Sequence, residues 1–116
     1  MKPSALFIIS SDPRLSARPA EGIRIAAGIG VWKQVDVTVS LCGAAVLILG
    51  ECVDGLMDED SFGRYLPILG GFGHPVYVQA DAPSLEEIGQ STLPIERLTL
   101  PKLAELAAAN TYVIRF

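Results

Sequence analysis

The chain alternates short, uninterrupted apolar runs with longer segments whose apolar residues recur at helical spacing. The first run, Ala5–Ile9, contains no polar residue and is typical of a strand buried on both faces of a parallel sheet. After it, Pro19 stands where a first helical residue is expected. One helical face follows it, formed by Ile23, Ala26, Ala27, Gly30 and Val31. Strands that alternate with helices in this way predict an α/β fold with a parallel sheet.

The rest of the chain continues this alternation. We predict five strands, near Ser4–Ser10, Val35–Ser40, Pro75–Ala80, Ile95–Leu98 and Thr111–Phe116. We predict helices at Ala44–Leu49, at Phe62–Leu69 behind a Ser61 cap, at a short turn capped by Ser84, and from Pro101 to Asn110. A helix is favoured over a strand at Ala44–Leu49 because Leu41-Cys42-Gly43 is a poor hairpin turn. The predicted architecture is a three-layer α/β/α domain with a five-stranded parallel sheet, spanning residues 1–116.

Composition and charge exclude several classes of protein. A chain of 116 residues suits one domain, and its 50% hydrophobic content excludes a disordered chain. Lys+Arg 9 against Asp+Glu 13 gives a net charge of −4, which argues against nucleic-acid binding. No apolar run reaches the roughly 18 residues of a membrane helix, and no basic region of a signal peptide is present. We therefore expect a cytoplasmic protein that does not bind a membrane.

Metal and nucleotide sites are also not expected. The two cysteines, Cys42 and Cys52, are too few for a disulfide scaffold, and with the single His74 they cannot form a full Cys/His zinc site. The acidic segment 54–60 lacks the spacing of an EF-hand and is interpreted as a solvated loop. The sequence has no phosphate-binding GxxxxGK[ST] motif, and Gly28-Ile29-Gly30 lies inside a predicted helix. We expect reduced thiols and no cofactor.

The candidate binding site lies where the parallel strands end, because ligands of such sheets bind beyond the carboxyl ends of the strands. Three segments reach this edge: Ser10–Arg18, Leu41–Gly43 and Gln79–Ser84. Arg14 and Arg18 could bind an anion there together with backbone amides, and Ser11 and Gly43 complete the candidate site. The alternative interpretation is that both arginines are simply solvated.

Cys42 is the candidate catalytic residue. It follows the second predicted strand and begins a predicted helix, whose positive end favours the reactive thiolate. The alternative is a small buried residue that fills a tight turn. Cys52, flanked by Glu51 and Asp54, is interpreted as structural. His74 precedes the third strand and therefore belongs to the opposite edge of the sheet, so we do not expect a Cys–His nucleophile pair.

Several segments that together cover nearly the whole chain match one known pattern. They are Ala5–Ile9, Glu21–Ala27, Val37–Val39 followed by Cys42–Val46, Phe62–Leu66, Pro75–Val78 and Leu103–Phe116. This pattern resembles the DsrE/DsrF-like family, which includes subunits of bacterial sulfur-relay complexes. The resemblance implies a five-stranded parallel sheet between helices and assembly into trimers or hexamers.

The resemblance also implies where sulfur chemistry would occur. In sulfur-transferring members, a cysteine in the loop after the third strand holds a persulfide, whereas the corresponding loop here, Gln79–Ser84, has no cysteine. This favours a non-catalytic assembly or binding subunit linked to sulfur metabolism, with other sulfur-relay subunits as candidate partners. Two alternatives stay open: a sulfur carrier or sulfurtransferase that uses Cys42, and a small-ligand or anion binder at the carboxyl edge.

We expect the protein to form a homo-oligomer, a trimer or a hexamer. A small domain in which half the residues are hydrophobic must expose some apolar surface, and such surface usually marks an interface. Candidate interface residues are Trp32, Tyr65, Phe72 and His74, the last two in a glycine-rich segment. In the alternative interpretation, Trp32 and Tyr65 cap the core of a monomer.

Overall fold

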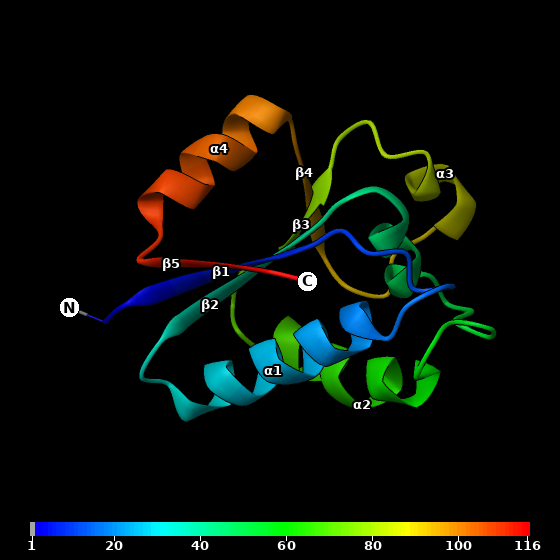
Figure 1. The fold of residues 1–116 in the computed structure, drawn as a ribbon, viewed down its shortest axis with the longest axis horizontal. Helices are drawn as coiled ribbons and strands as arrows, with labels where there is room; N and C mark the ends of the chain where they lie inside the picture. The colour runs from blue at the N-terminus through cyan, green and yellow to red at the C-terminus, as the bar shows by residue number, and fades with distance from the viewer. Residues whose placement is uncertain (1) are drawn as a thin grey trace.

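The computed structural model, which describes residues 2–116, contains one five-stranded sheet in which each strand runs parallel to its neighbours (Figure 1). The strands are β1 (Ser4–Ile9), β2 (Asp36–Leu41), β3 (Val76–Gln79), β4 (Ile95–Leu98) and β5 (Tyr112–Arg115). Their order across the sheet is β4-β3-β2-β1-β5. The predicted five-stranded parallel sheet is confirmed, and the unbroken apolar run forms β1, which is buried from its second residue onward.

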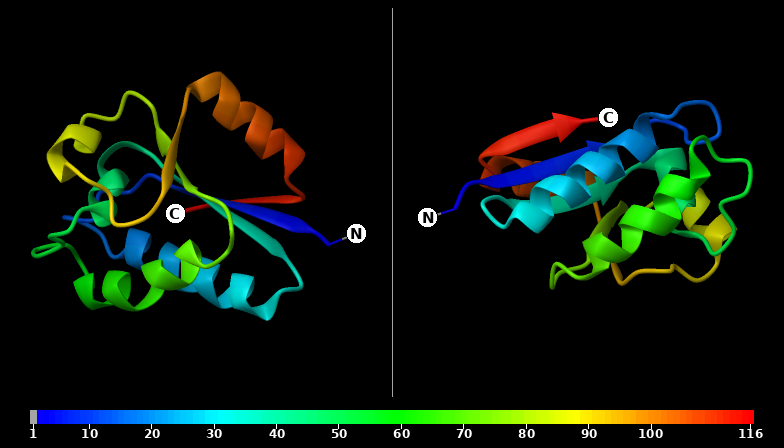
Figure 2. Two further views of the ribbon diagram at one scale, coloured as in Figure 1. Left: turned by 180° about the vertical axis from the view of Figure 1, so that it is seen from behind. Right: turned by 90° about the horizontal axis from the view of Figure 1, so that it is seen from below.

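Helices cover the two faces of the sheet unequally. The helices α1 (Arg18–Trp32) and α2 (Glu59–Gly70) lie side by side on one face, and α4 (Leu100–Ala109) lies on the other (Figures 1 and 2). The main core lies beneath α1 and α2, where Phe7, Ile23 and Phe62 are almost completely buried. No residue of α4 is fully buried. The layer formed by α4 therefore packs much less tightly than the opposite layer.

Two short helices lie beyond the carboxyl ends of the strands and pack against each other. They are η1 (Gly43–Leu49) and α3 (Ser84–Ile88). The helix predicted at Ala44–Leu49 is present, but it is a 3₁₀ helix. Its ends show the corresponding i→i+3 bonds, from the Ala45 amide to the Cys42 carbonyl at 3.1 Å and from the Gly50 amide to the Leu47 carbonyl at 3.3 Å. Tight 3₁₀ winding is common in short connecting helices.

Two predicted helix caps are wrong. The helix α2 begins at Glu59, after Asp58 with φ of 54°, so Ser61 lies inside the helix and does not cap it. Its first turn carries Glu59 and Asp60, whose charges suit the positive end of the helix dipole. Ser84 lies inside α3, and Pro83 occupies the cap position. The Ser84 hydroxyl instead donates a hydrogen bond to the Gly43 carbonyl, as described below.

No helix within residues 2–116 combines the length and the hydropathy needed to cross a membrane.

Candidate functional site

The turn between β2 and η1 forms the centre of the carboxyl edge. Leu41 pairs with Val78 in the sheet, so Cys42 lies opposite Gln79 at the end of β3. The Gln79 side chain accepts a hydrogen bond from the Gly43 amide at 2.9 Å. Its amide group donates to the Asp81 carboxylate at 2.8 Å. One side chain therefore joins the ends of two strands to the loop that follows β3.

The other backbone group of Gly43 is also occupied. The Ser84 hydroxyl, on a residue only 6% exposed, donates a hydrogen bond to the Gly43 carbonyl at 2.7 Å. Gly43 has φ of 56°, a left-handed conformation that glycine adopts without strain. The contact fixes α3 against η1. The Gly43 amide that was predicted to bind a ligand is thus part of an internal hydrogen-bond network with Gln79 and Ser84.

Arg14 and Arg18 both lie near this edge, but each is bound to a different partner within the chain. The Arg14 guanidinium donates two hydrogen bonds to Asp12, at 3.0 and 2.8 Å, and these bonds lower the pKa of the Asp12 carboxyl. The Arg18 guanidinium lies 5.6 Å from the centre of the Phe116 ring and donates to the Arg115 carbonyl at 3.3 Å. An anion would have to compete with these contacts.

The Ser11 amide is bound as well, because it donates to the Phe116 carbonyl at 3.4 Å. This bond, with the neighbouring one from Ser10 to the same carbonyl at 3.1 Å, joins the segment after β1 to the end of the chain. The four predicted ligand-binding residues therefore lie at one edge of the sheet, but each supplies a group to contacts within the chain.

Cys42 is a free, half-buried thiol on the side of β2 that faces α4. Burial raises the pKa of this thiol above its ordinary value, although the nearby Ser40 hydroxyl and the charge of Arg115 act in the opposite direction. Ser40 is only 1% exposed, and its hydroxyl has no hydrogen bond of good geometry among the described residues. Cys52, by contrast, is exposed. Within residues 2–116 no cluster of three or more metal-ligating side chains occurs.

We predict that iodoacetamide at neutral pH modifies Cys52 several-fold faster than Cys42 in the folded protein. Cys42 is less accessible, and its raised pKa leaves less thiolate at that pH. Mass spectrometry of peptides taken over a time course measures both rates. The control is the urea-unfolded chain, in which the two rates should converge, and a faster reaction of Cys42 in the folded state would contradict the burial described here.

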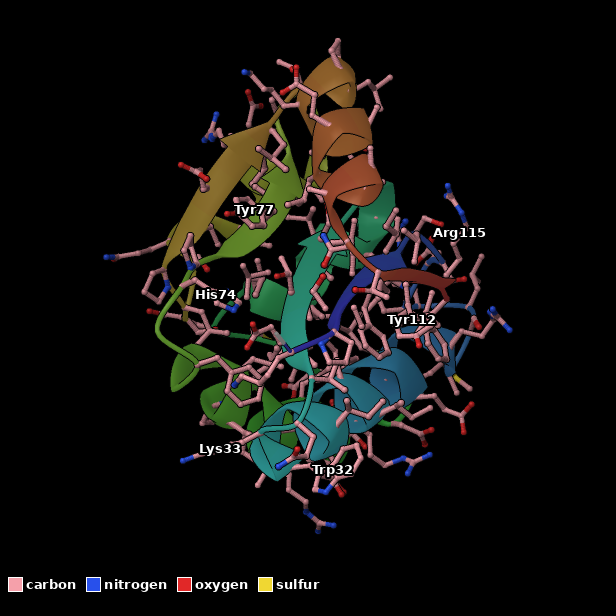
Figure 3. The ribbon with its side chains drawn as sticks, turned by 90° about the vertical axis from the view of Figure 1, so that its left-hand side faces the viewer. Trp32, Lys33, His74, Tyr77, Tyr112 and Arg115 are labelled. Carbon is pink, nitrogen blue, oxygen red and sulfur yellow. The ribbon has the colours of Figure 1, made fainter. Side chains whose placement is uncertain are left out.

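The opposite, amino edge of the sheet gathers exposed apolar side chains. Val31 and Trp32 end α1 and are 55% and 66% exposed, and Tyr112 and Val113 begin β5 and are 57% and 40% exposed. Figure 3 shows this side of the molecule, with Trp32 and Tyr112 among the labelled side chains. They form two separate groups at this edge, one on α1 and one on β5, and the adjacent strand residues Tyr112 and Val113 point to opposite faces of the sheet. We call the four residues of these two groups the amino-edge patch.

The remaining predicted interface residues divide between this edge and the core. Phe72 and His74 border a surface hollow of about 640 Å³ at the amino edge, together with Gly30, Val31 and Lys33. Tyr65 instead lies within α2, where it packs against the main core. The structure thus brings Trp32, Phe72 and His74 to one end of the molecule and places Tyr65 elsewhere.

Sequence reasoning missed the roles of Gln79 and Ser84 at the carboxyl edge. A usable signal was the polar Gln79 at the end of an otherwise apolar-patterned strand, because a buried or half-buried amide needs partners. Its partner Gly43 follows only from the register of β2 against β3, which no local pattern specifies. The tertiary role of Ser84 was hidden because serine is also a favoured helix cap.

Together, the strand order, the parallel register and the helices on both faces define a DsrE-like α/β fold. Among solved structures, the crystal structure of the ychN protein from E. coli is similar over 100% of both chains, with a TM-score of 0.76 and 21% sequence identity. No family model matches the sequence, and no match is found among curated proteins. At this identity the likeness establishes the fold alone.

Proposed function

We propose that this protein is a cytoplasmic DsrE-like subunit that works by assembly and binding, in a process linked to sulfur metabolism. The observation that carries the proposal is the amino-edge patch. Seven large hydrophobic side chains of the described chain are strongly exposed, and four of them are the members of this patch. Large apolar side chains left exposed at one edge of a molecule are candidates for contact with another macromolecule.

The surroundings of the patch suit a protein interface. Aromatic side chains such as Trp32 and Tyr112 are enriched at interface cores, which polar residues usually surround. Here the neighbouring polar groups include Lys33 and the Lys2–Asp36 ion pair, whose charged atoms are 3.3 Å apart. The proposed partner is a second copy of this chain, in a trimer or a hexamer as the DsrE/DsrF resemblance implies, with other sulfur-relay subunits as further candidates.

The carboxyl edge supports a role without group transfer. The loop after β3, where the resemblance would place a persulfide cysteine, contains no sulfur and is held by the bonds of Gln79 and Ser84. The internal contacts of Arg14 and Arg18 likewise disfavour an anion site there. These observations support the assembly proposal over both alternatives at this edge.

A sulfur carrier that uses Cys42 is the second candidate, favoured by the Ser40 hydroxyl and the positive charge of Arg115, which both act to lower the pKa of the thiol. In that reaction, the Cys42 thiolate would attack the outer sulfur of a donor persulfide. A new S–S bond would form on Cys42 as the donor left as a thiolate. The raised pKa of Cys42 opposes this role because it lowers the thiolate fraction.

Sulfur labelling separates the two candidates. We predict that incubation with a cysteine desulfurase and labelled cysteine leaves Cys42 without stoichiometric label, because the thiol is half-buried and mostly protonated. Digestion and peptide mapping locate any label, and the Cys42→Ser variant gives the background. Stoichiometric label on Cys42 that disappears in this variant would replace the assembly proposal with the carrier.

A further inference from the structure

A cavity of about 340 Å³ lies between the end of η1, the helix α2 and the segment that contains Thr92 and Leu93. Its volume lies within the range of small-molecule pockets, roughly 300–1,000 Å³. The walls are mainly apolar and include Ile48, Phe62, Leu66 and Leu93. A main-chain hydrogen bond from the Thr92 amide to the Leu49 carbonyl, 2.9 Å long, holds two of the bordering segments together.

Two residues of α2 that line the cavity weaken the helix and leave a backbone acceptor there. Gly63 lies inside the helix, and a Cβ atom built on it meets nothing within 4 Å. Pro67, one helical turn later, has no N–H group, so the Gly63 carbonyl cannot accept the usual helical hydrogen bond from that position. Both residues border the cavity, which places an acceptor without its helical donor at the wall.

The charge near the cavity is negative and favours a cationic ligand. Glu51 is the one charged residue among those that line it within residues 2–116. Glu51 also borders the adjacent hollow, whose other charged residues are Asp54, Glu87 and Arg14. The whole chain carries a net charge of −4. An apolar cavity with an exposed carboxylate at its border, next to a carbonyl that lacks its i+4 helical donor, suits a ligand with an apolar body and a hydrogen-bond-donating cation.

We propose that this cavity is a binding site for a small organic amine, in which the apolar part lies against Phe62, Leu66 and Leu93. The protonated amino group points toward Glu51 and the Gly63 carbonyl. This site is separate from the amino-edge patch and does not depend on the proposed assembly.

Three indole probes test the chemistry of the ligand. Tryptamine carries a cationic ammonium group, 3-ethylindole lacks this group and is neutral, and indole-3-propionate carries an anionic carboxylate. We expect saturable tryptamine binding with NMR shifts at the amides of Gly63, Leu66 and Leu93, binding of 3-ethylindole weaker by about fivefold, and the weakest binding for the anion. Equal affinities for the three probes, shifts that map elsewhere, or no saturable binding would overturn the proposal.

Variants test the location of the site without damage to the fold. Gly63→Leu places a side chain where open space exists and improves helix propensity, so it should fold and lose tryptamine binding at least tenfold. Gly28→Leu is the matched control, since Gly28 is an exposed glycine of α1 with nothing within 4 Å of its Cβ position. Glu51→Gln should remove the preference for tryptamine over 3-ethylindole, and Glu86→Gln should keep it. Unchanged tryptamine binding by the Gly63→Leu variant would overturn the proposal. A change in the oligomeric mass of this variant would also overturn it, because the cavity would then belong to a contact between subunits.

Discussion

Replacing Gly30 by alanine should lower the free energy of unfolding by about 1–3 kcal/mol, the usual cost of forcing extra atoms into packed surroundings. A Cβ atom at Gly30 would lie 2.2 and 2.3 Å from two carbons of the Phe72 ring. No real contact is that short, so the Phe72 ring must shift away from α1, and part of its contact with the core is lost. Urea unfolding at one fixed protomer concentration measures the change.

In the matched control, the same substitution at Gly28, the change in the free energy of unfolding should have the opposite sign. Gly28 lies in the same helix, is exposed, and has nothing within 4 Å of its Cβ position. Gly28→Ala should therefore raise the free energy of unfolding by about 0.5–1 kcal/mol, as expected for glycine replaced inside a helix. In a Phe72→Ala background, Gly30→Ala should become stabilising as well. A destabilising effect that persists without the Phe72 ring would show that the contact described here is not its cause.

Placing charges in the amino-edge patch should dissociate the assembly. The double variant Trp32→Glu and Tyr112→Glu puts two carboxylates where the proposed subunits meet, and burying unpaired charges costs far more than a small interface can supply. Both side chains are more than half exposed in the single chain, so the fold should persist. We predict a mass near 12.3 kDa for this variant by light scattering, with an unchanged circular dichroism spectrum.

Two apolar residues outside the patch that are at least as exposed provide the control. Leu15 is 81% exposed and Leu100 is 67% exposed, and neither lies at the amino edge. Leu15→Glu with Leu100→Glu adds the same charge and removes as many apolar side chains, but it should leave the mass of the wild-type particle unchanged. Dissociation by the control variant as well would point to general charge repulsion instead of a specific surface.

The fold could be predicted well because its strongest determinants are local. The unbroken apolar run of β1 is typical of a strand covered on both faces, and the apolar residues of α1 recur at the spacing of one helix face. The similar run Ala44–Leu49 needed the poor turn before it to be assigned as a helix. Helix starts were less predictable. The residue before α2, Asp58, has a left-handed conformation and lies inside an acidic segment, where the sequence resembles a solvated loop more than a helix cap.

The sites were less predictable than the fold because they depend on segments distant in the sequence. Sequence order placed Arg14 and Arg18 at the carboxyl edge, but their partners Asp12 and Phe116 became clear only from the structure. The cavity beside α2 had one weak local signal, the glycine and proline four residues apart in a helix. Its other walls come from η1 and from Leu93, which only the tertiary structure brings to the helix.

The mass of the wild-type protein in solution tests the central claim, that this DsrE-like chain works as an assembly subunit. Light scattering over a range of micromolar concentrations should give three or six times the 12.3 kDa of one chain. The emission of Trp32, the one tryptophan in the sequence, should shift to shorter wavelength as the assembly forms and covers it. A mass near 12.3 kDa that persists as the concentration rises, with the emission of an exposed tryptophan, would contradict the proposed function.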